Sequence, residues 1–183
     1  MIAYRSAVLA DAMAIAQLHA KSWQENYRGA FSDVYLDDLA LSERQQVWRK
    51  RLENPISEQR VVVADSNGII VGFACIFISD HAVYGTLLDN LHVSKDVQGL
   101  GVGRHLMSLV AKEVLKNPSS LGMYLWVLEN NKAAQGFYDS CGGERLETVE
   151  GTDIGDKPIL KVRYYWSSME KLIRTNKQKN DLK

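Results

Sequence analysis

The sequence predicts a single mixed α/β domain, in which a mostly antiparallel sheet is flanked by helices. Three observations predict this fold class. The chain has 183 residues, 46% of them hydrophobic and 24% charged, which is enough for one core without disulfides or metals. Its apolar residues switch between helical spacing and β-branched runs, in the order β-α-α-β-β-β-α-β-α-β-β. A glycine cluster at residues 98–104 separates a strand from a helix.

The first half of the chain predicts a strand, two amphipathic helices and a hairpin. These elements cover residues 2–5, 12–23, 42–52, 60–64 and 69–78. Asp11 stands at the N-cap position of the first helix. Pro55 follows the second helix and stops it, because proline disfavours helical backbone in the residue before it. Turn formers at residues 65–68 join two runs of β-branched residues and predict the hairpin.

The second half predicts strands and helices in alternation. The strands cover residues 86–93, 123–128, 145–149 and 159–166, and the helices cover residues 102–114 and 133–141. The first of these strands is polar in its second half and leads directly into the glycine cluster. Residues 1–168 therefore form one domain. Residues 174–183 contain four basic residues and one aspartate, so we expect a basic, frayed tail over residues 169–183.

The charge balance excludes several classes of partner. The chain has 22 Lys and Arg against 22 Asp and Glu, which removes the broad positive field on which most nucleic-acid binders rely. The N-terminus lacks a basic start followed by an apolar core, and no apolar run reaches the length of a membrane span. Two isolated cysteines, Cys75 and Cys141, fit a reducing compartment. We expect a cytoplasmic protein that binds neither nucleic acid nor a membrane.

The glycine cluster predicts an anion-binding turn. Gly99, Gly101 and Gly103 let the backbone turn tightly and aim several N–H groups at one point, and the dipole of the following helix adds to them. The spacing does not fit a P-loop, since no Gly-Lys-Ser/Thr follows. It does not fit a dinucleotide fingerprint either, which requires a glycine at Arg104. A pyrophosphate fits such a turn, and a plain tight connection from strand to helix is the alternative.

Two blocks of sequence resemble the GNAT superfamily of acetyl-CoA-dependent N-acetyltransferases. The first matches its Gln/Arg-x-x-Gly-x-Gly/Ala signature at Gln98, Gly99, Leu100, Gly101, Val102 and Gly103. The second, residues 130–142, resembles a recurring pattern of Asn, Ala, Phe-Tyr and Gly, at the expected distance. Residues 22–29, 35–39 and Trp48 are similar to a bacterial branch that includes polyamine acetyltransferases. The resemblance covers residues 5–166 and implies a GNAT-like sheet that is splayed between its middle strands.

What the resemblance implies first is a binding site for acetyl-CoA as co-substrate. The cofactor lies between the two splayed strands, where backbone groups of one strand pair with the pantetheine arm and the glycine turn holds the pyrophosphate. The implied residues are Leu91, Val93, Gln98, Gly99, Leu100, Gly101, Val102, Gly103, Arg104 and Asn130. For Asn130, an N-cap of the helix that begins near Ala133 is the alternative.

Acetyl transfer needs a neutral amine and a proton for the departing thiolate. Tyr138 matches the tyrosine that donates this proton in many family members, and a buried structural tyrosine is the alternative. The strand over residues 86–93 offers Asp89 and His92 as the base. Alternation places these two on opposite faces of the sheet, so only one can face the amine. Leu87 stands where family members carry an acidic residue, which departs from the family pattern.

On the acceptor side, the resemblance implies that Trp23 and Tyr27 shape an amine site, and packing of Trp23 and Trp48 against the sheet is the alternative. The expected function is transfer of an acetyl group to a primary amine, on a small molecule such as a polyamine or on a peptide. The transfer is direct, in a ternary complex. A non-catalytic acyl-CoA-binding regulatory module is the first alternative, and a cofactor-free interaction domain is the second.

Three further expectations complete the prediction. Neither cysteine has a neighbour that lowers a thiol pKa, so we expect no acyl-enzyme. The histidines have no metal-ligand spacing, so we expect no metal. The final strand carries Tyr164, Tyr165 and Trp166, and these aromatic residues predict a surface for a homodimer.

Overall fold

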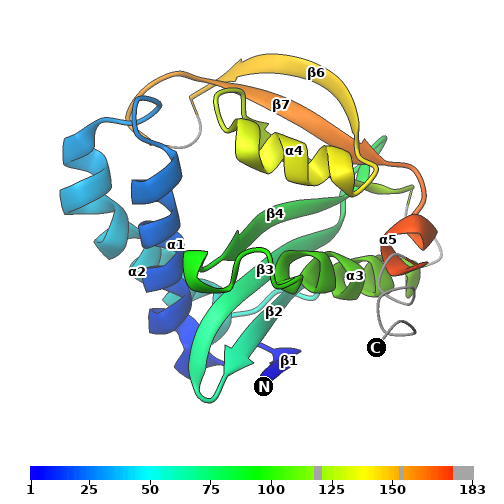
Figure 1. The fold of residues 1–183 in the computed structure, drawn as a ribbon, viewed down its shortest axis with the longest axis horizontal. Coiled ribbons are helices and arrows are strands. Elements are labelled where there is room, and N and C mark those ends of the chain that lie inside the picture. Colours follow the sequence, from blue (N-terminus) through cyan, green and yellow to red (C-terminus); the bar gives the residue numbers. More distant parts are fainter. Residues whose placement is uncertain (118–120, 153–154, 175–183) are drawn as a thin grey trace.

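The computed structural model describes residues 1–117, 121–152 and 155–174. In this part of the chain, seven strands form one sheet in the order β1-β2-β3-β4-β5-β7-β6 (Figure 1). The strands are β1 (Ile2–Ser6), β2 (Gln59–Ser66), β3 (Ile69–His81), β4 (Gly85–Val93), β5 (Met123–Leu128), β6 (Glu144–Gly151) and β7 (Ile159–Trp166). Neighbouring strands are antiparallel except β4 and β5, which are parallel. The predicted mixed, mostly antiparallel sheet is confirmed.

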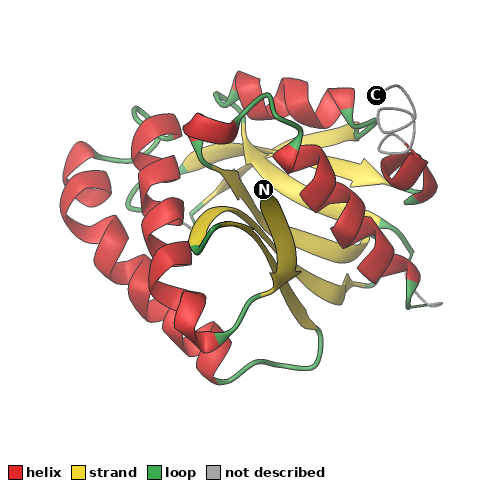
Figure 2. Cartoon of the chain, turned by 60° about the horizontal axis from the view of Figure 1, so that its bottom comes forward, coloured by secondary structure: helices red, strands yellow, loops and turns green. Residues whose placement is uncertain are grey.

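Helices lie on both faces of the sheet (Figure 2). They are α1 (Ala12–Asn26), α2 (Ala40–Glu53), α3 (Val102–Leu115), α4 (Lys132–Ser140) and α5 (Glu170–Arg174). Shorter helical turns cover Leu9–Asp11, Tyr35–Leu39 and Lys95–Val97. The four predicted helices are present, with ends that differ from the prediction by a few residues. No helix in the described ranges is long and apolar enough to cross a membrane.

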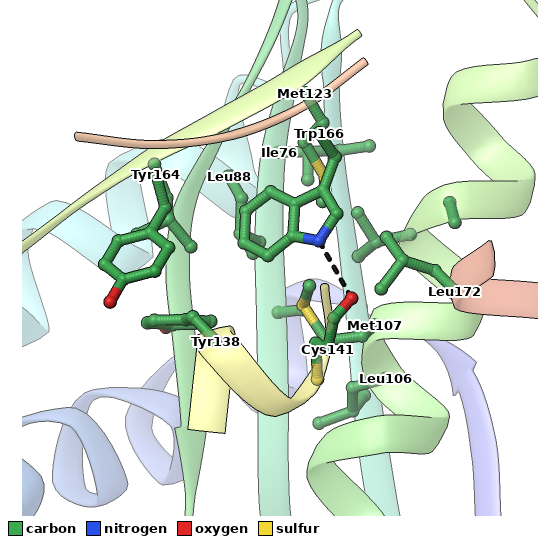
Figure 3. Close-up of a cluster of buried hydrophobic side chains, with 14 of the residues drawn as sticks. Ile76, Leu88, Leu106, Met107, Met123, Tyr138, Cys141, Tyr164, Trp166 and Leu172 are labelled. Atoms are coloured by element: carbon green, nitrogen blue, oxygen red, sulfur yellow. Dashed lines mark hydrogen bonds between the residues drawn. The ribbon is translucent and has the colours of Figure 1, made fainter. Parts of the chain in front are cut away.

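The side chains of β3 show how the two faces are divided. Phe73 and Cys75 lie in the apolar cluster beneath α1 and α2, whereas Ala74 and Ile76 lie in a second cluster beneath α3. Successive strand residues point to opposite faces, so this alternation gives the sheet two cores. The cluster beneath α3 also includes residues of α4, β7 and α5 (Figure 3). We call these the α1–α2 face and the α3–α4 face.

The sheet divides between β4 and β5. These strands share only two register pairs, Thr86 with Met123 and Leu87 with Tyr124. Beyond them, β4 continues antiparallel to β3 as far as Val93, while β5 continues antiparallel to β7 as far as Leu128. The two strands therefore separate along the chain. This is the predicted splay between the middle strands, and it is confirmed.

A β-bulge at Asp89 changes which side chains of β4 face α1 and α2. Leu88 is opposite Ile76 and Asn90 is opposite Cys75, so Asp89 is the extra residue. Asp89 then contacts Arg51 of α2, and His92 contacts Ser22 of α1. Both side chains therefore lie on the α1–α2 face. The prediction of opposite faces is wrong, because simple alternation does not hold across a bulge.

Asp11 is the N-cap residue of α1, as predicted, but it does not act through a side-chain capping bond. Asp11 has helical backbone angles, and its carboxylate caps no amide of α1. It accepts a hydrogen bond from the Val8 amide at 2.8 Å and forms an ion pair with Arg5 at 2.7 Å. This carboxylate therefore fastens the turn before α1 to β1, and the Arg5 hydrogen bonds lower its pKa.

The C-terminal segment differs from the predicted frayed tail at its start. Met169 is 3% exposed and Leu172 is 5% exposed, and both pack in the core of the α3–α4 face. The boundary at residue 169 is therefore too early, because α5 buries its apolar side. Residues 175–183 of the predicted tail lie outside the described residues.

The aromatic residues of β7 mostly lie inside the chain. Tyr164 is 0% exposed and Trp166 is 3% exposed, and the Trp166 indole donates to the Cys141 carbonyl oxygen at 3.0 Å (Figure 3). The Tyr165 hydroxyl donates to the Leu121 carbonyl oxygen at 2.7 Å. Two of the three aromatic residues behind the homodimer prediction therefore belong to the core. The homodimer itself stays a prediction.

Candidate functional site

The glycine turn opens α3 with its backbone exposed. Gly99 has φ +78° and Gly101 has φ +86°, and a Cβ atom on either would meet no atom within 4 Å. Such left-handed angles favour glycine. The first bond of α3 runs from the His105 amide to the Gly101 carbonyl oxygen at 3.0 Å. The amides of the preceding turn have no carbonyl within the helix, so the positive end of α3 is available to an anion.

Side chains around this turn hold it to its neighbours. The Gln98 side chain donates to the Val93 carbonyl oxygen at 3.1 Å. Arg104 donates to the Ser140 carbonyl oxygen and hydroxyl, at 3.2 and 2.9 Å, and so ties α3 to the end of α4. A Cβ on Gly103 would lie 3.3 Å from the Phe137 ring, so this glycine permits close packing of the two helices. The predicted anion site therefore consists of backbone amides.

Two other predicted residues of the turn differ in exposure. Leu100 is 72% exposed, while Val102 is 2% exposed and packs in the core of the α3–α4 face. Only the backbone of Val102 can meet a ligand at the turn. The Leu100 side chain projects from it and is the apolar group that such a ligand would meet.

The open edge of β4 lies beside this turn. The Ser94 amide donates to the Val71 carbonyl oxygen of β3 at 2.9 Å. Backbone groups along a strand alternate in direction, so those of His92 also face β3 and those of Leu91 and Val93 face away from it. The Gln98 bond to the Val93 carbonyl agrees with this direction. The edge that β5 has left thus presents the backbone of Leu91 and Val93.

Tyr138 lies on α4, within the core of the α3–α4 face. It is 8% exposed, and its ring centroid is 5.7 Å from that of Tyr164 and 6.0 Å from that of Trp166 (Figure 3). Burial, with a smaller contribution from Tyr27, raises the pKa of the Tyr138 phenol above its ordinary value. The hydroxyl therefore keeps its proton at physiological pH. The hydroxyl is therefore a hydrogen-bond donor. This agrees both with a tyrosine that protonates the thiolate and with a buried structural tyrosine.

Asp89 is engaged by an arginine. The Arg51 Nη1 atom donates to Asp89 Oδ2 at 2.7 Å and to the Asn90 side chain at 3.1 Å. The guanidinium also lies 5.2 Å from the Trp48 ring. Because Arg51 balances its charge, Asp89 is poorly placed to act alone as a base or as an anchor for a cation.

His92 lies among groups of α1 and α2 and is half-buried. Its Nδ1 atom is 2.8 Å from the Ser22 hydroxyl, and its ring is 4.4 Å from the ring of His19. Burial and the charge of Arg44 lower the pKa of His92 to about 4. His92 is therefore a neutral imidazole at physiological pH.

Trp23 and Tyr27, the predicted acceptor residues, stack on each other at 5.6 Å. Trp23 is 3% exposed, packs on Phe31 and carries the Arg44 guanidinium 4.5 Å above its ring. Tyr27 is half-buried, and burial raises its pKa to about 12. The depth of Trp23 favours the packing interpretation, as does the complete burial of Trp48.

Asn130 is exposed just beyond β5. The N-cap of α4 is its neighbour Asn131, whose side chain accepts a hydrogen bond from the Ala134 amide at 3.1 Å. The alternative interpretation of Asn130 as the N-cap is therefore wrong. Its side chain remains open to solvent at the splayed end of β5.

Nucleophilic chemistry finds little support at the two cysteines. Burial raises the pKa of the Cys75 thiol to about 12 and also raises that of Cys141, so neither is a ready thiolate. Within the described ranges, no three His, Cys, Asp or Glu side chains form a metal-binding group.

The sequence pattern missed several residues of this region, above all Ser22, Arg44 and Arg51. They come from two helices and meet β4 only through the tertiary fold. His19 does repeat at the apolar spacing of α1, and this spacing shows that it is buried without showing what it contacts.

Comparison with known proteins identifies the family. The family model described as acetyltransferase (GNAT) family matches residues 14–142. The chain therefore belongs to the GNAT family and is an acetyl-CoA-dependent acyltransferase.

Its relatives agree with this assignment. It is similar to an uncharacterized N-acetyltransferase, YuaI, of Bacillus subtilis, with 29% identity over 94% of this chain and 96% of that protein. It is also similar to a probable N-acetyltransferase, Rv2775, of Mycobacterium tuberculosis, with 29% identity over 75% and 77% of the two chains. Its fold resembles the PaiA N-acetyltransferase of Thermoplasma acidophilum, solved with coenzyme A. That match has a TM-score of 0.71 and 18% identity and covers 91% of this chain and 99% of the other.

Proposed function

We propose that this chain transfers the acetyl group of acetyl-CoA to a primary amine by direct attack in a ternary complex. One observation carries the proposal: the exposed amides of the glycine turn continue into a strand edge, at Leu91 and Val93, that lacks a β5 partner. The two together offer an anion site followed by a place for an extended, amide-containing chain. Coenzyme A has that order of groups.

The residues present fit this cofactor. The space above Gly99 and Gly101, where a Cβ would meet nothing, is open to a pyrophosphate. The backbone of Leu91 and Val93 pairs with the amides of the pantetheine arm, and Asn130 meets the arm from β5. When bound, acetyl-CoA supplies an activated acetyl thioester. The coenzyme A in the PaiA structure supports this assignment.

Tyr138 protonates the departing sulfur in this proposal. Burial keeps its phenol protonated, and α4 places it on the same face of the sheet as the glycine turn. The Tyr138 environment also supports a second candidate, a non-catalytic acyl-CoA-binding module. A phenol packed against Tyr164 and Trp166 has a sufficient structural reason to be there.

His92 accepts the proton of the amine. It is neutral at physiological pH, whereas Asp89 is already paired with Arg51. His92 lies on the α1–α2 face, opposite the glycine turn, so the acceptor approaches from the side of Trp23 and Tyr27. The acceptor class is a primary amine, on a small molecule such as a polyamine or on a peptide.

The test is thioester consumption with a panel of primary amines, comparing the wild type with Tyr138→Phe. We expect at least one amine to accelerate turnover and Tyr138→Phe to lower kcat about 10- to 100-fold, the range of a positioned acid. Acetyl-CoA affinity should be unchanged. Tyr164→Phe is the matched control, because it removes a hydroxyl from the same cluster that bonds only to α4.

Two outcomes contradict the proposal. If wild type binds acetyl-CoA and no amine accelerates turnover, the chain is the non-catalytic module. If Tyr138→Phe and Tyr164→Phe lower kcat equally, Tyr138 is a structural residue.

A further inference from the structure

Next to His92 lies a second, fully buried histidine that the proposed reaction does not use. His19 of α1 is 0% exposed, and its ring lies 4.4 Å from the ring of His92, at an interplanar angle of 34°. It also contacts Trp23 edge-on at 4.7 Å and Phe73 at 5.7 Å. A fully buried imidazole needs hydrogen-bond partners, so its bonds indicate its state.

Trp48 determines the tautomer of His19. The Trp48 Nε1 atom lies 3.0 Å from His19 Nδ1. An indole nitrogen can only donate, so Nδ1 accepts and the single proton of the neutral ring is on Nε2. Burial, followed by the charges of neighbouring groups, lowers the pKa of His19 well below its ordinary value. His19 is thus a neutral ring with one defined tautomer.

The other nitrogen of His19 has no partner among the described residues. Its Nε2 atom is buried and makes no hydrogen bond to any described residue. An apolar side chain of similar size would remove this unpaired donor, but it would leave the buried Trp48 indole without its acceptor. The Trp48 bond is thus one reason for a histidine here, and the His19 ring also lies against the ring of His92.

Ser22 contacts the Nδ1 atom of His92. The Ser22 Oγ and His92 Nδ1 atoms are 2.8 Å apart, and a hydroxyl can donate or accept at this distance. When the Ser22 hydroxyl accepts, it satisfies an N–H group at Nδ1 of His92. The proton of His92 is in that case on Nδ1. Its Nε2 atom, which makes no hydrogen bond to the described residues, keeps a lone pair.

We infer that Ser22 and His19 are positioning residues that hold His92 as the Nδ1–H tautomer, with its Nε2 lone pair free to take the proton of the acceptor amine. Ser22 fixes the proton, and the ring of His19 limits rotation of the His92 ring. This inference rests on the proposed function, since it gives the base of that reaction its orientation.

The neutrality of His19 matters because positive charge already surrounds His92. From α2, Arg44 and Arg51 act on this pair of rings, and Asp89 of β4 is paired with Arg51. Phe73 is the uncharged neighbour from β3. A cationic His19 only 4.4 Å away would further oppose proton uptake by His92. Burial, together with the Trp48 bond to Nδ1, keeps His19 neutral and prevents this.

The test is nitrogen-15 NMR of the imidazole side chains in the full-length wild type. The chain has four histidines, so the spectrum can be assigned by substitution. At pH 7 we expect His92 to carry its proton on Nδ1 and His19 to carry its proton on Nε2, with neither ring charged. A proton on Nε2 of His92, or on Nδ1 of His19, overturns the inference whatever the activity.

Ser22→Ala tests the consequence for catalysis. We expect the His92 signal to move toward the Nε2–H tautomer and kcat/KM for the amine to fall about tenfold, with acetyl-CoA affinity unchanged. The acidic limb of the pH profile should move to lower pH, because Ser22 accepts a stronger hydrogen bond from the charged ring than from the neutral one. Ser22→Thr, which keeps the hydroxyl, should restore all three properties.

Ser42→Ala is the matched control, since Ser42 lies on α2 and its hydroxyl donates to the Leu39 carbonyl oxygen, away from both rings. A tautomer change in Ser22→Ala with kcat/KM and pH profile unchanged overturns the positioning role. The failure of the proposed function is a separate outcome: wild-type tautomers as expected, with no amine in the panel accelerating turnover.

Discussion

The two halves of β4 have the same backbone direction and differ in their partners. Residues 85–88 are paired with β3 on one edge and approach β5 on the other, and three of these four residues are buried. Residues 90–93 are paired with β3 alone, and all four are half-buried. The difference begins at the bulge of Asp89. It shows that a binding edge for an extended ligand arises where strand pairing stops.

The closed half is held by the close approach of two glycines. The Thr86 amide donates to the Gly122 carbonyl oxygen at 3.0 Å. A Cβ on Gly85, which has φ +76°, would lie 2.5 Å from that same oxygen. Backbone and backbone meet here with no room for a side chain, so this contact fixes where the two strands begin to separate.

Gly85→Ala should disrupt the contact between β4 and Gly122 in the closed half. We expect it to have the largest effect of the substitutions proposed here. The substitution combines a left-handed backbone with a clash against backbone, so we expect a loss of about 3 kcal/mol or more in the free energy of unfolding. Denaturant titration measures it. Gly68→Ala is the control, with φ +87° and open space around its Cβ, and should cost about 1–2 kcal/mol. Equal losses in both variants would contradict the close approach.

Gly101→Asp should weaken binding of acetyl-CoA beside the open half of β4. It places a carboxylate beside the amides that receive the pyrophosphate, so we expect acetyl-CoA affinity to fall about 100-fold, equivalent to about 2.7 kcal/mol. Calorimetry measures it. Gly68→Asp carries the same charge and a similar φ in the β2–β3 turn, and should bind as wild type does. Unchanged acetyl-CoA affinity in Gly101→Asp would contradict the assignment of the glycine turn as the anion site.

The buried histidines on the α1–α2 face should make stability depend on pH. Their folded pKa values lie below the ordinary 6.5, so the unfolded chain binds more protons at acidic pH. Stability contributed by the neutral rings is complete above pH 6.5 and falls as the pH decreases toward 4. Each ring contributes a slope of up to about 1.4 kcal/mol per pH unit. Denaturation at pH 7, 6 and 5 measures this slope, and His92→Gln should reduce it. A flat profile over this range would contradict the burial of both rings as neutral groups.

The smallest effect concerns the cysteines. Because burial raises the pKa of the Cys75 thiol to about 12, iodoacetamide at pH 8 should leave Cys75 unmodified in the folded chain. Mass spectrometry of the treated protein measures it, with unfolded protein as the positive control. Thioester turnover should survive the double substitution Cys75→Ala and Cys141→Ala. Loss of turnover in a folded double variant would support a mechanism through an acyl-enzyme intermediate.

The open and closed halves of β4 also differ in how far the sequence predicts them. The glycine turn is predictable because Gly99 and Gly101 need left-handed backbone, and that need is local. The splay follows from the family resemblance. The bulge at Asp89 is not predictable from alternation, because β3 and β4 together determine the register.

The acceptor side depends even more on tertiary contacts. Arg51 reaches Asp89 from 38 residues away, and Trp48 reaches His19 from 29 residues away. Neither pair has a spacing in the sequence that predicts a contact between its two residues. Sequence could therefore offer Asp89 and His92 as candidates, and only their partners in the fold separate the engaged carboxylate from the neutral imidazole.

Amide hydrogen exchange along β4 tests most directly the central claim, that acetyl-CoA occupies the edge β5 leaves open. The same strand contains its own control, because the His92 amide faces β3 and those of Leu91 and Val93 face the open edge. We predict that acetyl-CoA slows exchange at Leu91 and Val93 and leaves His92 unchanged. Equal rates at Leu91 and Val93 with and without saturating acetyl-CoA would contradict the account.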